Sequence, residues 1–140
     1  MAGNDPETLL NEIGAYLAED VEYPLEGTLL YARIGDNVVG PSVFKDAGSH
    51  IAYRDGMDGP LCDLLMQFWR TQNLPSETSI FIEYVVHGGR FDLSIAYSDD
   101  LDPDVSWSDL RDESIRRHFG DKPVLYPSFE DVEKGMTYDL

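Results

Sequence analysis

The sequence is short of the residues on which many functions depend. It has one cysteine, Cys62, so no disulfide can form within the chain, and this fits a reducing cytosol. Its histidines, His50, His87 and His118, are scattered without the spacing of a zinc site. No apolar run approaches the roughly 20 residues that span a bilayer, and no basic and apolar leader opens the chain. We therefore expect a cytoplasmic protein that does not bind membranes.

The motifs of common enzyme classes are missing as well. There is no Gly-x-Ser-x-Gly nucleophile elbow, no phosphate-binding loop and no Gly-x-Gly-x-x-Gly dinucleotide motif. Asp100, Asp102 and Asp104 have the spacing that starts a calcium-binding loop. However, Val105 stands where that loop needs glycine, and Arg111 stands where it needs glutamate. We therefore predict a protein that is not an enzyme, with no catalytic residues, no cofactor and no metal site. Weak binding of a divalent cation by the carboxylate cluster stays open.

Positive charge is scarce. The 140 residues include 27 acidic and only 10 basic side chains, which gives a formal net charge of −17. A field of this sign repels nucleic acid and anionic membranes, and it attracts basic proteins or cations. We therefore expect no direct binding of nucleic acid, and a basic protein is the partner that the charge favours. Solubility is the simpler explanation of the same charge.

What the sequence does contain is a clear β-hairpin between Thr78 and Tyr97. Two alternating apolar segments flank Gly88-Gly89, and glycine pairs of this kind form the two-residue turn that joins antiparallel strands. A shift of one residue would bury Asp92 and Ser94, so the pattern specifies the register. The four predicted cross-strand pairs, all on one face, are Val86 with Phe91, Tyr84 with Leu93, Ile82 with Ile95, and Ile80 with Tyr97.

Three helices are predicted around this hairpin. The first starts at Asp5-Pro6, because Asp caps a helix and Pro suits its first turn. The second starts at Pro60 and has the strongest apolar stripe of the chain. The third is capped by Ser106 or Ser108 and ends at Gly120.

Further strands are predicted at 28–34, from Val38 onwards, and at 49–53. Pro41 indicates that the middle one is an edge strand or starts afresh near Ser42, and an exposed edge around Val38–Phe44 would permit a homodimer. This order predicts an α+β fold: a mainly antiparallel sheet of four to five strands with helices packed on one face, in a single domain of residues 1–140. An extended segment bounded by prolines is expected over 122–131.

The candidate binding surface follows the hairpin directly. The second strand leads into Ser98–Asp104, a loop dense in aspartate, and loops held by rigid elements are where binding residues are usually found. Tyr97, Leu101 and Trp107 are candidate apolar anchors, because aromatic side chains dominate interface energies. The predicted protein-binding residues are Asp99, Asp100, Leu101, Asp102, Asp104, Trp107, Asp109, Asp112 and Glu113.

The stretch Gly88–Leu101 resembles part of the YezG-like family: a glycine turn, a strand led by Phe91, then Tyr97, an acidic pair and a leucine. The later segments Arg116–Phe119 and Tyr126-Pro127 are compatible with that family. Its members are small acidic bacterial proteins described as antitoxins or immunity proteins. The resemblance implies a stoichiometric inhibitor of a toxin, often a nuclease, whose basic active site an acidic protein can occupy by mimicking phosphate.

Two other functions stay open. An enzyme or small-ligand-binding protein would have its site between sheet and helices, in a pocket with convergent polar groups and shifted pKa values. A scaffold or chaperone subunit would present the same acidic surface without any toxin as a partner. The sequence does not separate this last function from that of an antitoxin.

Overall fold

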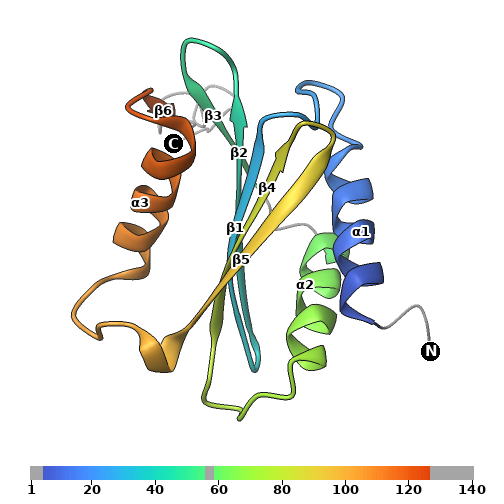
Figure 1. The fold of residues 1–140 in the computed structure, drawn as a ribbon, viewed down its shortest axis with the longest axis vertical. Helices are drawn as coiled ribbons and strands as arrows, with labels where there is room; N and C mark the ends of the chain where they lie inside the picture. The colour runs from blue at the N-terminus through green and yellow to red at the C-terminus, as the bar shows by residue number, and fades with distance from the viewer. Residues whose placement is uncertain (1–4, 56–58, 127–140) are drawn as a thin grey trace, which may run out of the picture.

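The protein is described here by a computed structural model that covers residues 5–55 and 59–126. The predicted α+β fold is confirmed, with six strands where four to five were expected (Figure 1). The sheet has the strand order β5-β4-β1-β2-β3-β6, and every neighbouring pair is antiparallel except β3 and β6. The elements are α1 (Pro6–Leu17), β1 (Thr28–Gly35), β2 (Val38–Asp46), β3 (Ile51–Asp55), α2 (Gly59–Thr71), β4 (Ile80–His87), β5 (Arg90–Tyr97), the 3-10 helix η2 (Ser98–Asp100), α3 (Trp107–Phe119) and β6 (Val124–Leu125).

The helix boundaries follow the predicted capping residues. The Asp5 carboxylate accepts a hydrogen bond from the Thr8 amide at 2.8 Å, with Pro6 in the first turn of α1. Ser106 caps α3, because its Oγ accepts from the amide of Asp109 at 3.1 Å. Gly120 ends α3 with a φ of 75°, in the left-handed region that glycine enters without steric cost.

The hairpin has the predicted register. His87 pairs with Arg90 across the turn, and the four apolar pairs are those expected from the sequence. Gly88 and Gly89 have φ values of 65° and 76°, which the primed two-residue turn requires. The carboxylate of Glu26 accepts from the Gly88 amide at 2.9 Å and from the Gly89 amide at 3.4 Å, so the preceding segment fixes the turn in place.

One face of the sheet is covered by α1 and α2. Their apolar stripes pack on the inward side chains of β1, β2 and β4, and on the half-buried row that β5 contributes. Two buried polar contacts fix the packing: the Tyr84 hydroxyl donates to the Leu10 carbonyl at 2.8 Å, and Trp69 Nε1 donates to the Thr78 carbonyl at 3.2 Å. This face contains most of the apolar core.

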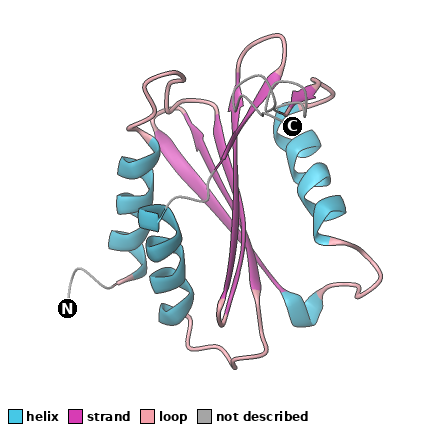
Figure 2. Ribbon diagram, turned by 180° about the vertical axis from the view of Figure 1, so that it is seen from behind, coloured by secondary structure: helices cyan, strands magenta, loops and turns pink. Residues whose placement is uncertain are grey.

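The third helix lies on the other face, so the expectation that all helices share one face is wrong (Figures 1 and 2). Leu29, Phe44, Ile51 and Ile115 form a second, smaller cluster there. The strands β1 and β4 carry apolar residues on both sides, and a sheet of this kind must be covered twice.

The strand β2 is continuous through Pro41, which pairs with Ala32 of β1. Among the described residues, β3 pairs with β2 from Ser42 onwards, so Pro41 lies in the part of β2 that has one described neighbour, which suits its missing N–H. The predicted edge at Val38–Phe44 is therefore wrong for residues 42–44, which lie between two strands. In the tail, Val124 and Leu125 form β6, and residues 127–131 of the predicted extended segment lie outside the described part.

Candidate functional site

The predicted acidic surface is formed by η2, the loop after it and the first half of α3, which we call the acidic segment (residues 99–113). Its start is fixed to the beginning of β4. The Ser98 amide donates to the Ser79 carbonyl at 2.9 Å, and the Ser79 amide donates to Ser98 Oγ at 3.0 Å. The hydroxyl of buried Thr78 donates to the Asp99 carboxylate at 2.9 Å. The hairpin thus holds the segment in a defined position.

The rest of the loop is ordered by short local contacts. The Asp104 amide donates to the Asp102 carboxylate at 2.9 Å, and the Ser106 cap then starts α3. Asp99 and Asp102 therefore have structural roles within the loop. Asp100, Asp104 and Asp109 have none that the described residues show.

All seven acidic side chains predicted for the surface are exposed. Glu113 has one distant cation, with Arg117 Nη2 at 3.9 Å from its carboxylate. The other six carboxylates have no ion pair with any described residue. The segment therefore presents a concentration of negative charge that the described part of the fold does not neutralise.

The structure does not bring all the predicted residues to one patch. Leu101 and Glu113 border a hollow of about 190 Å³ on the flank of α3 that faces β4, together with Leu110. Asp112 borders a different hollow of about 260 Å³ on the flank that faces β6. Asp112 is thus separated by the width of the helix from the surface that contains Leu101.

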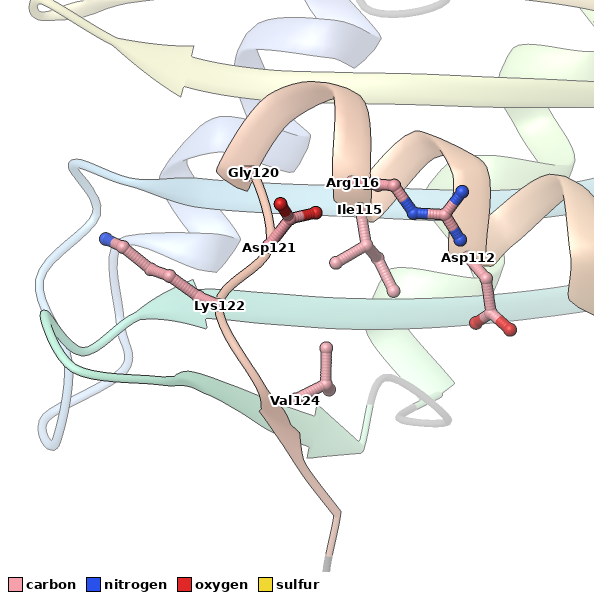
Figure 3. A pocket seen from close by; sticks show the side chains of 7 residues that line it. All are labelled: Asp112, Ile115, Arg116, Gly120, Asp121, Lys122 and Val124. Atoms are coloured by element: carbon pink, nitrogen blue, oxygen red, sulfur yellow. The ribbon is translucent and has the colours of Figure 1, made fainter.

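The hollow beside Asp112 is shown in Figure 3. Ile115 and Val124 face each other across it, and Asp112 and Arg116 lie on one side. The Lys122 ammonium extends away and is bound to the Asp46 carboxylate at 2.9 and 3.0 Å. That contact attaches the segment after α3 to the sheet. The Lys122 ammonium is therefore not available to a ligand in the hollow.

The predicted anchor Trp107 is half-buried and already has a partner. The Arg111 guanidinium stacks on its ring at 4.9 Å, and the rings of Phe44 and Tyr126 lie within 6 Å of the same guanidinium. Arg111 Nη1 also donates to Ser42 Oγ at 3.2 Å, whereas its buried Nε has no hydrogen-bond partner among the described residues. Trp107 therefore helps to seat α3 on the sheet, and only part of its ring is available to another protein.

A polar cluster that the sequence analysis missed lies between α3 and the sheet. Arg117 Nη1 donates to both carboxylate oxygens of Glu83 at 2.8 Å, and His118 Nε2 lies 2.7 Å from Oε2. Burial disfavours the charged form of Glu83, yet the hydrogen bonds from Arg117 and His118 outweigh it, so the pKa of this carboxyl is below its ordinary value. Burial, with a smaller contribution from the Glu83 charge, raises the pKa of Tyr31 to about 12.

This cluster has the properties of a structural anchor. A general acid or base works best with a pKa near the working pH, and the lowered pKa of Glu83 moves it away from neutrality. Both side chains that contact Glu83, Arg117 and His118, come from α3, so the cluster attaches that helix to β4. No sequence signal could have identified it, because 34 residues separate Glu83 from Arg117.

A third hollow, of about 320 Å³, lies between α1 and the hairpin. Leu25, Tyr84 and Phe91 give it an apolar lining, with Asn11, Glu26 and Arg90 also on its border. The pKa of Glu26 is below its ordinary value mainly because its carboxylate accepts a hydrogen bond from the Gly88 amide, which belongs to the hairpin turn. The shift is therefore no sign of catalysis.

Tests for other site types were negative within the described residues. In residues 5–55 and 59–126, no three His, Cys, Asp or Glu side chains are grouped so that they could hold a metal ion. A membrane-crossing helix, long and apolar enough to span a bilayer, is likewise not found there. No protein-family model, no curated protein and no solved structure matches the chain.

Proposed function

We propose that this chain is a non-enzymatic binding protein that captures a basic protein through the acidic segment. The resemblance of Gly88–Leu101 to the YezG-like family makes a toxin the favoured partner, and an antitoxin or immunity protein the favoured role. Neutralisation would be stoichiometric, with the carboxylates occupying the basic site of the toxin. A nuclease fits this role, since its active site binds phosphate.

The proposal rests on how the basic and the acidic side chains are engaged. Five of the chain's ten basic residues contact other described residues of the fold: Lys45, Arg54, Arg111, Arg117 and Lys122. The seven carboxylates of the acidic segment are exposed, and six of them form no ion pair with a described residue. An uncompensated field of this kind accelerates encounter with an oppositely charged protein.

The test compares two triple variants. Asp100→Asn, Asp104→Asn and Asp109→Asn remove charge from the acidic segment but leave the structural residues Asp99 and Asp102 in place. The matched control removes three exposed charges from the α1 region, with Glu7→Gln, Glu12→Gln and Glu19→Gln. Tagged wild type is first used at low salt to capture its partner from the cells that encode it, and the purified partner is then used for kinetics.

We expect wild type to retain one basic protein in stoichiometric amount, and the acidic-segment variant to associate about tenfold more slowly at low salt. The difference should disappear as salt rises, because the attraction is screened. An empty eluate at low salt, or equal association rates for both triple variants, would contradict the proposal. If the partner is a nuclease, titration with this protein should abolish cleavage at one equivalent.

The hollow between α1 and the hairpin favours a second candidate function, the binding of a small molecule. Apolar walls with a few polar groups on the border are typical of ligand pockets. Native mass spectrometry of protein purified from its own cells tests this function. A bound small molecule that Phe91→Ala releases would support it, and a spectrum of the bare chain would count against it.

A further inference from the structure

The strand β5 ends the sheet, and no described strand pairs with its outer edge. Proteins usually protect such edges with proline, charged side chains such as lysine, bulges or very short strands. The edge of β5 has only two charged residues of this kind, Arg90 and Asp92: the strand is eight residues long, contains no proline or lysine, and pairs with β4 without a bulge. In Figure 1, β5 lies in front of the other strands, between α1 and α3. It is a long and regular edge that another strand can join.

The hairpin geometry determines which peptide groups face this edge. Residues on both sides of a two-residue turn form a hydrogen-bonded pair, so Arg90 and every second residue after it bond to β4. The bond from the Ser98 amide to the Ser79 carbonyl continues the same alternation. The N–H and C=O groups that point outward therefore belong to the intervening residues, Phe91, Leu93, Ile95 and Tyr97. Their side chains form the half-buried apolar row beside the main core.

We infer that β5 is a dimerisation edge, on which β5 of a second copy adds in antiparallel orientation and joins two sheets into one. An alignment centred on Ser94 overlaps the whole strand. It pairs Phe91 with Tyr97 and Leu93 with Ile95 across the two-fold axis, so all outward peptide groups find partners. Aromatic and aliphatic pairs of this kind stabilise neighbouring strands.

A local contact between opposite charges favours a second copy as the occupant. In this alignment Arg90, the one cation of β5, lies opposite Ser98 of the other copy and next to its Asp99 and Asp100. Symmetry repeats the contact at the other end of the paired strands. The helices cover the faces of the sheet: α2 packs on β1 and β2, α3 packs on β1, and hollows lined by α1 and by α3 lie beside β5.

The net charge of −17 on each copy opposes association at low salt. Dimerisation should therefore strengthen as salt rises, whereas capture of a basic partner should weaken. The two activities are thus distinguishable in one set of buffers, and either can fail without the other.

Sedimentation velocity over a concentration series tests the inference, in about 0.15 M and about 1 M NaCl, where the Debye length falls from about 8 Å to about 3 Å. We expect a species with twice the mass of the chain, present at lower concentrations in the higher salt. A single-chain mass at every concentration in both buffers would overturn the inference.

Charge substitutions locate the interface. Arg90→Glu places a negative charge next to Asp99 and Asp100 of the other copy at both ends of the paired strands. It should raise the dissociation constant of the dimer about tenfold. Asp100→Arg should weaken it less, because Asp99 remains opposite Arg90. The matched controls are Arg70→Glu on the exposed surface of α2 and Asp104→Arg in the loop, and neither should weaken it.

The equimolar mixture of the two edge variants keeps the test informative if one variant folds poorly. One end of the mixed dimer has the wild-type contacts, so the mixture should dimerise more strongly than either variant alone. A dimer that Arg90→Glu leaves unchanged, or a mixture no stronger than its components, would show that β5 is not the interface.

Discussion

The two faces of the sheet are covered by different kinds of contact. On the first face, α1 and α2 bury whole apolar side chains, including Ile13 and Leu65 at 0 % exposure. On the second face, α3 buries only Ser114 and Ile115. Charged groups add contacts of another kind: the Glu83 cluster, the Arg111 stack and, just after the helix, the Lys122 bond to Asp46.

The two faces therefore have different roles: the first should determine most of the stability, and the second determines where the candidate surface lies. Apolar burial is the dominant favourable term in folding, so the first face should determine most of the free energy of unfolding. Ion pairs and cation–π contacts add less, but they are directional, and here they fix where the acidic segment lies. The second face should therefore respond to pH and charge substitutions that hardly affect the first.

The largest expected effect comes from truncating one side chain on each face. Leu65→Ala should lower the free energy of unfolding by about 3 kcal/mol or more, because it leaves a sealed cavity in the main core. Ile115→Ala should cost about 2 kcal/mol, because Ile115 borders a hollow that already opens to solvent. Urea unfolding followed by far-ultraviolet circular dichroism measures both. Equal losses of unfolding free energy in the two variants would contradict the difference between the two faces.

The second largest effect is expected from a substitution in the polar cluster around Glu83. Glu83→Gln removes the charge that Arg117 and His118 share, and it should cost about 1.5–3 kcal/mol. Glu113→Gln is the matched control on α3, since Glu113 is exposed and 3.9 Å from Arg117, and it should cost about 0.5 kcal/mol or less. If both substitutions cost the same in urea unfolding, the cluster would not be the anchor of α3.

The pH dependence of Glu83→Gln sharpens this test. Because the pKa of folded Glu83 is below the ordinary 4.5, its stabilisation is present above that value and is lost as the pH falls through the folded pKa. The difference in unfolding free energy between wild type and Glu83→Gln should shrink below about pH 4.5. Asp20 and Asp46 also have lowered pKa values, but they are present in both proteins and cancel. A difference that stays constant down to pH 3 would contradict the assignment.

The smallest effect concerns the stacked arginine. Arg111→Lys keeps the charge but loses the planar group that contacts Trp107, Phe44 and Tyr126, and it should cost about 0.5–1 kcal/mol. Arg116→Lys, at an exposed position of the same helix, should change almost nothing. Near-ultraviolet circular dichroism and urea unfolding measure the two variants. If Arg111→Lys had the spectrum and the unfolding free energy of the wild type, the stack would not hold α3 on the sheet.

Local features of this fold were predictable from the sequence, and contacts across the sheet were not. The glycine pair specifies the register of the hairpin, and Asp5, Ser106 and Gly120 mark helix ends, because each acts on its immediate neighbours. The face that α3 covers depends on the second apolar side of the sheet, which an alternating pattern reports only weakly.

The candidate site was predictable to the same extent. Exposure of the seven carboxylates follows from their residue type, and all seven are exposed. The separation of Asp112 from Leu101 by the width of α3, and the partner of Trp107, depend on how that helix docks. Whether the nine predicted residues bind a protein stays a prediction.

The order of the elements along the chain also determines which of them can fold first during synthesis. Every strand and helix that builds the first face has left the ribosome once Tyr97 has emerged, and domains fold as units during synthesis. The acidic segment comes after that point, and β6 closes the far side of the sheet with a contact from Ile51 to Val124. A nascent chain can therefore bury its main core before the acidic segment emerges.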